Sequence, residues 1–297
     1  MAGVIIREIR HVNYGRCIEM SNGEVDLIVT VDCGPRIIRF GLNGKENEFC
    51  ESDAEGSATY GNELWYTRGG HRFWHSPESF PRTYIADNQP VEYQVIDQGI
   101  RVIQQSEPWT QIQKMMEISL SPQNNIVNIK HRLVNKNAWP VKLAAWAITV
   151  MAVGGKEIIP NPQRDTGLLP NRTVALWPYS KMNDSRICWG DLFTILAQNP
   201  KMKEPFKFGV SNEAGWAAYV NHGNLFIKRY VHKLGAEYPD FGVSYETYTT
   251  DFMLEMESLS PLVLLEPEAE LEHEEEWELI AGVDFTAAVD RLFPNQN

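Results

Sequence analysis

The densest group of chemically active side chains lies between Tyr60 and Tyr84, in the segment YGNELWYTRGGHRFWHSPESFPRTY. This segment places aromatic rings next to charged hydrogen-bonding groups, and Gly69-Gly70 allows a tight turn or a close approach of a ligand to the backbone. Aromatic faces can stack on a sugar ring, while arginine, histidine and carboxylate groups bind its hydroxyls. The residue types therefore fit a sugar site, although a core aromatic cluster with surface arginines remains open. The candidate side chains are Arg68, His71, Arg72, Trp74 and His75.

The spacing of His71 and His75 is that of a zinc-binding helix, but the surrounding residues argue against one. Arg72 stands where such a motif needs a catalytic glutamate, and Gly69-Gly70 and Pro77 are unfavourable in a helix. We therefore expect no metal. The sequence also lacks a phosphate-binding Walker loop, a GxGxxG turn and a GxSxG elbow, so no cofactor is expected.

A second candidate is the segment Phe252–Pro261, with the sequence FMLEMESLSP. In a strand, Glu255 and Glu257 would point to one face and Leu254 and Met256 to the core. A carboxylate on an open sheet face is usually only solvated. On a concave face, the same group could act as a general base.

The elements that would position these residues are predominantly strands. Asn-Gly and related turns separate β-rich runs at 17–31, 91–103 and 216–230. Every even position from Glu268 to Glu278 is a glutamate, which predicts a strand with one solvated acidic face. A short helix is expected at 284–292 and a long loop at 160–179. We predict an all-β fold, a large antiparallel β-sandwich with few short helices, formed by residues 1–297 as a single domain.

Composition limits the partners of the chain. It has 27 Lys and Arg against 39 Asp and Glu, and a formal net charge of −12. This balance argues against nucleic acid and against an anionic membrane surface. The four cysteines form no CxxC pair, the N-terminal residues lack the pattern of a signal peptide, and the apolar run Leu143–Val153 is too short to span a membrane. We expect a cytoplasmic protein, either a monomer or a homodimer, that binds a small molecule.

Several stretches together resemble an uncharacterised bacterial family related to the galactose mutarotases, or aldose 1-epimerases. They extend from Gly15 to about Leu279, nearly the whole chain. The matching stretches are Gly34–Ile38, Gly69–Trp74, Trp139–Trp146, Leu169–Arg172, Leu176–Tyr179, Tyr238–Phe241 and Glu257–Pro261.

The resemblance implies a β-supersandwich with a sugar cleft on the concave face of a sheet. In such epimerases a glutamate takes the proton of the anomeric hydroxyl while a histidine protonates the ring oxygen, and the opened sugar recloses as the other anomer. By that pattern Glu257 resembles the base, with Glu255 as the alternative register. The implied sugar-binding residues are Arg68, Arg72, Trp74, Trp146, Glu255, Arg172 and Trp177.

The resemblance departs from the pattern at the acid. Mutarotases carry their acid histidine a few residues after a strand that matches Pro140–Ala145, and here the next residue is Trp146. Trp146 cannot release a proton near pH 7. Two hypotheses follow: an epimerase in which His71 or His75 supplies the acid, or a carbohydrate-binding protein without catalysis. The arginines also leave open a phosphate or carboxylate on the sugar.

Overall fold

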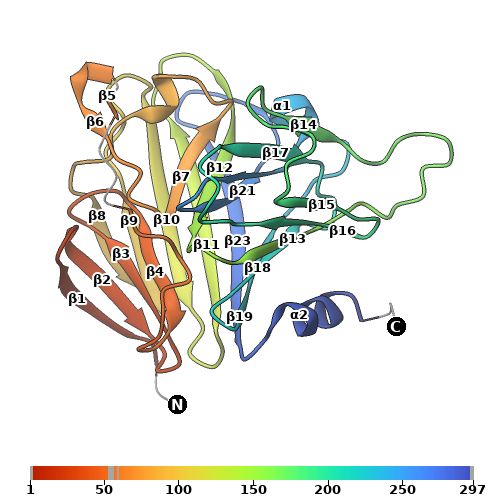
Figure 1. Ribbon diagram of the computed structural model, residues 1–297. Coiled ribbons are helices and arrows are strands. Elements are labelled where there is room, and N and C mark those ends of the chain that lie inside the picture. Colours follow the sequence, from red (N-terminus) through yellow and green to blue (C-terminus); the bar gives the residue numbers. More distant parts are fainter. Residues whose placement is uncertain (1–2, 53–56, 59, 295–297) are drawn as a thin grey trace.

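The computed structural model describes residues 3–52, 57–58 and 60–294. Two large antiparallel sheets face each other and account for most of the regular secondary structure of the described chain (Figure 1). The 11-stranded sheet runs in the order β1-β2-β3-β4-β7-β12-β21-β20-β17-β14, and β22 pairs with β12. Its strands are β1 (Ile5–His11), β2 (Gly15–Ser21), β3 (Val25–Thr30), β4 (Ile37–Leu42), β7 (Gly70–Ser76), β12 (Val141–Met151), β14 (Val174–Leu176), β17 (Phe206–Val210), β20 (Tyr245–Thr249), β21 (Leu254–Leu259) and β22 (Val263–Leu265).

The 10-stranded sheet runs in the order β15-β16-β13-β18-β19-β23-β11-β10-β9-β8. Its strands are β8 (Glu92–Ile96), β9 (Gly99–Ile103), β10 (Ile112–Leu120), β11 (Ile126–Asn135), β13 (Lys156–Pro160), β15 (Ile187–Trp189), β16 (Phe193–Ala197), β18 (Trp216–Asn221), β19 (Asn224–Tyr230) and β23 (Glu270–Ala281). A separate small pair is formed by β5 (Ser57–Ala58) and β6 (Leu64–Trp65). The predicted all-β sandwich is confirmed.

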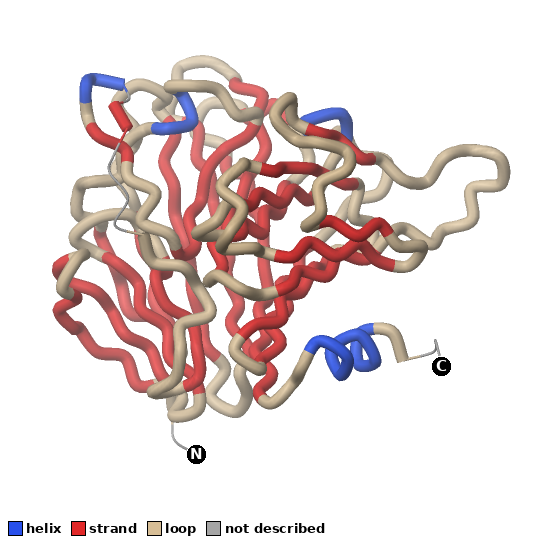
Figure 2. Tube along the Cα trace, in the orientation of Figure 1, coloured by secondary structure: helices blue, strands red, loops and turns tan. Residues whose placement is uncertain are grey.

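In the part of the chain that the structure describes, helices are few and short (Figure 2). They are the 3₁₀ turns at Tyr60–Asn62 and Arg82–Tyr84, the helical turn α1 (Pro239–Gly242) and the helix α2 (Phe285–Leu292). The predicted terminal helix is confirmed as α2, whose N-terminus is capped where Asp284 Oδ1 accepts a hydrogen bond from the Ala287 amide at 2.9 Å. Within the described residues, no helix is both long enough and apolar enough to cross a membrane.

The predicted hairpins are formed. In the turn between β2 and β3, the Asn22 side chain accepts hydrogen bonds from the amides of Glu24 and Val25, both at 3.0 Å, and Gly23 takes a positive φ of 94°. This φ is one that glycine adopts without a steric cost. Strands β8 and β9 and strands β18 and β19 pair in the same way across short turns.

The core lies between the sheets and is centred on Trp277 of β23. Its ring, fully buried, packs edge-on against Phe49 at 5.3 Å and lies 5.8 Å from Phe226 and 6.1 Å from Phe40. These phenylalanines come from three different parts of the chain, so Trp277 joins both sheets into one apolar core.

Strand β23 has the predicted acidic face. The even-numbered glutamates point outward and pair with cations of the neighbouring strands: Lys130 with Glu274 at 3.0 Å and Arg132 with Glu272 at 2.8 Å. The opposite face is less apolar than its tryptophan and leucines suggest, because His273 and Glu275 are buried there.

The predicted loop at 160–179 is only partly correct. Strand β13 ends at Pro160, and residues 161–173 form a long loop that extends away from the sheets at the right of Figure 1. Residues Val174–Leu176 then form β14, because Val174, Ala175 and Leu176 pair with β17. A run rich in proline and asparagine can therefore still contain a short edge strand.

Replacing Trp277 by alanine should lower the free energy of unfolding by about 3–5 kcal/mol, because it leaves a cavity among three phenylalanine rings. Urea denaturation measures this loss. Trp139→Ala is the matched control, since that side chain is 62% exposed and its removal should change stability by less than about 0.5 kcal/mol. Equal losses in the two variants would contradict this description of the core.

Candidate functional site

A cleft of about 380 Å³ lies over the outer face of the 11-stranded sheet. Its floor comes from five neighbouring strands, β7, β12, β21, β20 and β17. Its walls come from the chain on both sides of β7, from the chain that follows β14, and from the residues just before β17 and β21. The lining residues are Trp65, Thr67, Arg72, Trp74, Glu78, Tyr84, Trp146, Trp177, Tyr179, Pro205, Lys207, Tyr248, Met253 and Glu255.

The two-residue repeat of the strands decides which side chains reach this face. Trp146 of β12 is the register partner of Trp74 of β7, and Ile148 of β12 is the partner of both Arg72 and Glu257. Register partners in an antiparallel sheet point to the same face. The structure thus brings Arg72, Trp74, Trp146 and the two glutamates of β21 to one side of the sheet.

Arg72 and Glu255 form an ion pair in the cleft. Arg72 Nη2 donates to Glu255 Oε1 at 2.9 Å, and the guanidinium carbon lies 4.5 Å from the centre of the Trp74 ring. Both side chains are about nine-tenths buried. Among the described residues, Arg72 Nε and Nη1 have no hydrogen-bond partner. Arg72 therefore keeps donors for a ligand while Glu255 balances its charge.

Lys207 comes from β17, the last of these five strands, and its side chain extends over the neighbouring strands of the floor. Its ammonium group is 2.8 Å from Glu246 Oε2 and 2.9 Å from Glu257 Oε2, and it lies 4.8 and 4.7 Å from the ring centres of Trp146 and Trp177. The indole Nε1 of Trp146 also donates to Glu257 Oε2, at 2.9 Å. Lys207 and Trp146 thus lie between the cleft and Glu257, which is fully buried and does not line the cleft.

Burial and the mutual charges of Lys207, Glu246 and Glu257 shift the pKa values of all three groups. Burial raises the pKa of Glu257 and raises the pKa of Glu246 well above its ordinary value. For both glutamates, desolvation and a neighbouring carboxylate oppose ionisation more than Lys207 favours it. Burial also opposes the charge of Lys207, but Glu246 and Glu257 outweigh it and hold the pKa of Lys207 well above its ordinary value. Lys207 therefore stays charged at neutral pH and is a poor proton donor.

The two histidines considered as acids do not line this cleft. His71 and His75 alternate along β7 with Arg72 and Trp74, so they point to the opposite face, between the sheets. His71 is fully buried against His131 and Trp277, and His75 Nε2 lies 3.9 Å from Glu107 Oε2. The assignment of either one as the general acid of a cleft reaction does not fit this geometry.

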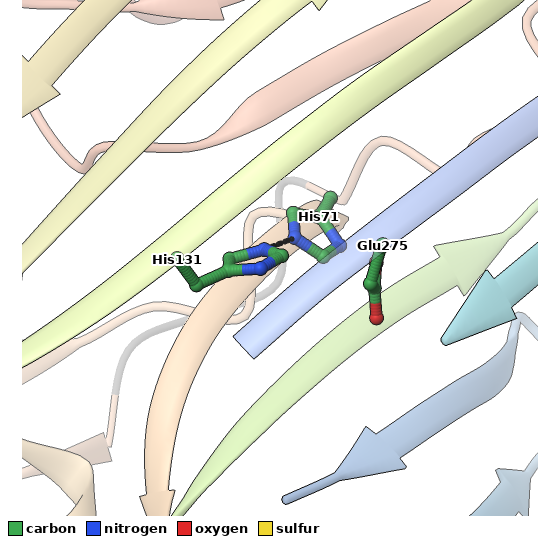
Figure 3. A group of neighbouring side chains, drawn as sticks. All are labelled: His71, His131 and Glu275. Atoms are coloured by element: carbon green, nitrogen blue, oxygen red, sulfur yellow. Dashed lines mark hydrogen bonds between the residues drawn. The ribbon is translucent and has the colours of Figure 1, made fainter. Parts of the chain in front are cut away.

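His71, His131 and Glu275 place possible metal ligand atoms within 4.8 Å of one another (Figure 3). Hydrogen bonds already use these atoms. His131 Nδ1 donates to the His273 carbonyl at 2.9 Å, so His131 Nε2 must accept from His71 Nε2 at 2.8 Å. His71 Nδ1 then accepts from Thr149 Oγ1.

Glu275 completes this network. Its carboxylate is 2.9 Å from the ammonium group of Lys228, which also donates to Thr149 Oγ1. A cation beside Lys228 would be repelled, and the histidine lone pairs are engaged. The cluster is better described as a buried hydrogen-bond network that joins the two sheets.

Two predicted binding residues lie elsewhere. Arg68 donates to Asn88 Oδ1 at 2.5 Å and to Cys33 Sγ at 3.4 Å, and it does not line the cleft. Arg172 donates to the Asp191 carbonyl at 2.7 Å and lines a different, polar hollow beside the long loop. The predicted residues Trp74, Trp146, Trp177, Arg72 and Glu255 line the cleft together.

Sequence reasoning missed Lys207 as a residue of the site. Lys207 stands between Phe206 and Phe208, two fully buried residues of β17, so strand alternation puts it on the face opposite the core. A polar residue between two large apolar residues of a strand therefore indicates a side chain on the face opposite the core. Glu78 and Tyr84 lie in the segment 60–84 that the sequence singled out, and Tyr179 lies in a stretch that carries the resemblance. No comparable signal singles out Tyr248, which reaches the cleft through strand order.

Replacing Lys207 by methionine should lower the free energy of unfolding by about 3–5 kcal/mol at pH 8, because Glu246 and Glu257 lose their cation while buried. The loss should shrink toward pH 5, because carboxyl groups whose folded-state pKa is raised are stabilised as they take up protons. Chemical denaturation at both pH values measures this. Lys201→Met, at an exposed lysine, is the control, and an equal loss at the two sites would contradict the assignment.

The buried histidines should make the fold sensitive to acid. Burial lowers the pKa of His131 and His273 to about 3 and lowers that of His71 well below its ordinary value. The unfolded chain takes up these protons below about pH 6.5, whereas the folded chain does not, so stability falls as the pH drops from 6.5 toward 3. His131→Asn should reduce the slope by up to about 1.4 kcal/mol per pH unit. His222→Asn, at an exposed histidine, should leave the pH dependence of the unfolding free energy unchanged, as measured by urea denaturation at several pH values. Equal pH dependence in the wild type and both variants would contradict the role of the buried histidines.

Comparison with known proteins supports the fold alone. No family profile matches the chain, and no curated protein sequence matches it. Solved structures do. A "putative aldose 1-epimerase" from Klebsiella pneumoniae superposes with a TM-score of 0.64 at 13% identity, over 97% of this chain and 86% of that one. A galactose mutarotase-like protein from Clostridium acetobutylicum gives 0.57 at 11% identity, over 94% and 99%.

A TPR-domain-containing protein from Parabacteroides distasonis also superposes, with a TM-score of 0.64 at 14% identity. The match covers 92% of this chain but only 48% of that longer protein. The fold is thus shared with proteins of different length and description. With two facing antiparallel sheets in this order and these structural neighbours, the chain has the galactose mutarotase-like β-sandwich fold.

Proposed function

We propose that this protein binds a neutral sugar, or a neutral unit of a larger saccharide, in the cleft over the outer face of the 11-stranded sheet, and that it does not open the sugar ring. The observation that carries the proposal is the composition of the cleft: indole and phenol rings form its surface around Arg72, Lys207 and Glu255. Its volume of about 380 Å³ is within the range of small-molecule sites, about 300–1,000 Å³.

Several groups of the cleft suit the hydroxyls and C–H faces of a pyranose. The rings of Trp177 and Trp146 both contact the ammonium group of Lys207, and the ring of Trp74 packs against the guanidinium group of Arg72. The buried donors Arg72 Nε, Arg72 Nη1 and Trp65 Nε1 have no hydrogen-bond partner among the described residues, and buried donors of this kind are costly unless a ligand satisfies them.

The charges favour a neutral ligand over a phosphorylated or carboxylated one. The cations that line the cleft are Arg72 and Lys207, and each already pairs with a carboxylate. Glu78 adds a further negative charge at the wall. An anionic substituent would therefore have to displace an internal ion pair, at a cost in desolvation and repulsion.

The proton donors of the cleft do not suit ring opening. Ring opening needs an acid and a base on opposite sides of the sugar, with pKa values near the working pH. Burial raises the pKa of Tyr248 to about 12 and also raises the pKa values of Tyr84 and Tyr179, and Lys207 is held charged. Glu255 could accept a proton, but a matched acid is missing from the residues that line the described cleft.

Calorimetric titration with galactose, glucose, maltotriose and cellotriose, and with glucose 6-phosphate and glucuronate, tests the ligand class. At least one neutral saccharide should bind, at least tenfold more tightly than either anionic sugar. Trp177→Ala should weaken that binding at least tenfold, because it removes one aromatic face. Phe241→Ala is the control, since that ring is 95% exposed and does not line the cleft. Absence of any neutral ligand would overturn the proposal.

Polarimetry of freshly dissolved α-galactose and α-glucose tests the second half of the proposal. Purified protein should leave the rate of mutarotation equal to that of buffer. A rate enhancement that Glu255→Gln removes would show instead that the cleft catalyses epimerisation with Glu255 as its base, and it would overturn this half of the proposal.

A further inference from the structure

We propose that a second saccharide-binding site lies at the end of the sandwich, in a pocket bounded by Trp109 and Trp139. This pocket has a volume of about 250 Å³ and is separate from the cleft already described. It is lined by both tryptophans, by His75, Arg82 and Asn137, and by residues at the starts of β10 and β12.

The two tryptophans carry the inference. Trp139 is 62% exposed and Trp109 is 43% exposed, and both line the same pocket. Tryptophan is large and apolar and is on average highly buried, so two such side chains around one hollow mark a binding surface rather than chance exposure. By contrast, Trp74, the neighbour of His75 in β7, is buried.

Polar groups at the base of the pocket offer directional hydrogen-bonding sites to a ligand. His75 is 4% exposed, and its Nε2 is 3.9 Å from Glu107 Oε2, too far for a hydrogen bond. Among the described residues, neither His75 Nε2 nor Arg82 Nε has a hydrogen-bond partner. Exposed indole faces around unsatisfied imidazole and guanidinium nitrogens suit the C–H faces and hydroxyls of a sugar, because a hydroxyl can both donate and accept.

The charge of the pocket favours a neutral saccharide here too. Lys142 lines it, but its ammonium group is bound to Glu237 at 2.6 Å. Arg82 Nη2 donates to the Pro77 carbonyl. A phosphate or carboxylate in the pocket would therefore meet one guanidinium group that already donates to a carbonyl. Such anions are bound best by a free guanidinium group, which can donate two parallel hydrogen bonds.

The two sites are distinct but close along the chain. Trp74 and His75 are consecutive residues of β7 that point to opposite faces, the first into the cleft and the second into the pocket. The segment after β7 also serves both, because Glu78 and Tyr84 line the cleft whereas Ser76 and Arg82 line the pocket. The inference does not require the cleft to bind sugar, since the pocket uses a different set of side chains.

Calorimetry on the full chain with cellotriose, maltotriose, xylotriose and galactose tests the pocket. Wild-type protein should bind at least one of these at the pocket, and Trp139→Ala and Trp109→Ala should each raise that Kd at least tenfold. Phe241→Ala should bind as wild type does. Unchanged urea midpoints in the two tryptophan variants ensure that the loss reflects binding and not unfolding.

Trp177→Ala separates the two sites. If the cleft proposal fails but the pocket is real, Trp177→Ala binds normally and Trp139→Ala does not. If both tryptophan variants of the pocket bind every probe as wild type does, or if no probe binds, the pocket proposal is overturned. Sedimentation gives the remaining outcome: a wild-type dimer that Trp139→Ala converts to a monomer would show that a second copy of the chain covers these tryptophans, and this too would overturn it.

Discussion

The ammonium group of Lys207 lies 2.8 Å from one buried carboxylate and 2.9 Å from another, and the floor of the cleft depends on this arrangement. Glu246 and Glu257 are register partners on adjacent strands, so their charges would repel each other without it. The same ammonium group touches the faces of Trp146 and Trp177. Lys207 therefore reduces the repulsion between these two carboxylates and also contacts the two indole rings of the aromatic surface.

The buried position of Glu257 does not fit the role of general base that the resemblance implies for it. A general base must reach its substrate, whereas Glu257 is covered by Lys207 and by the indole Nε1 of Trp146. Its structural effect is to orient those two groups toward the cleft. Glu255, two residues earlier on the same face, is the carboxylate of β21 that lines the cleft, and Arg72 holds it in place.

Much of the fold could be predicted from the sequence because its signals are local. Asn22-Gly23 specifies a turn, and the alternating glutamates of β23 specify a strand with one wet face. The site was harder to predict. Alternation in β7 separates His71 and His75 from Arg72 and Trp74, but it does not say which set faces the core. That choice depends on the partners of β7, namely Trp277 and His131 on one side and Trp146 on the other. These contacts join residues that are far apart in the chain.

Strand β12 lies between β7 and β21, and its two faces serve the core and the cleft in alternation. A one-residue insertion there would exchange Trp146 with Ala147 and would damage both faces at once. Trp177 and Tyr179 follow a short edge strand, and Glu78 lies beyond the end of β7, so they can change without shifting any register. During evolution, the walls of this cleft can therefore vary in sequence while its floor stays fixed.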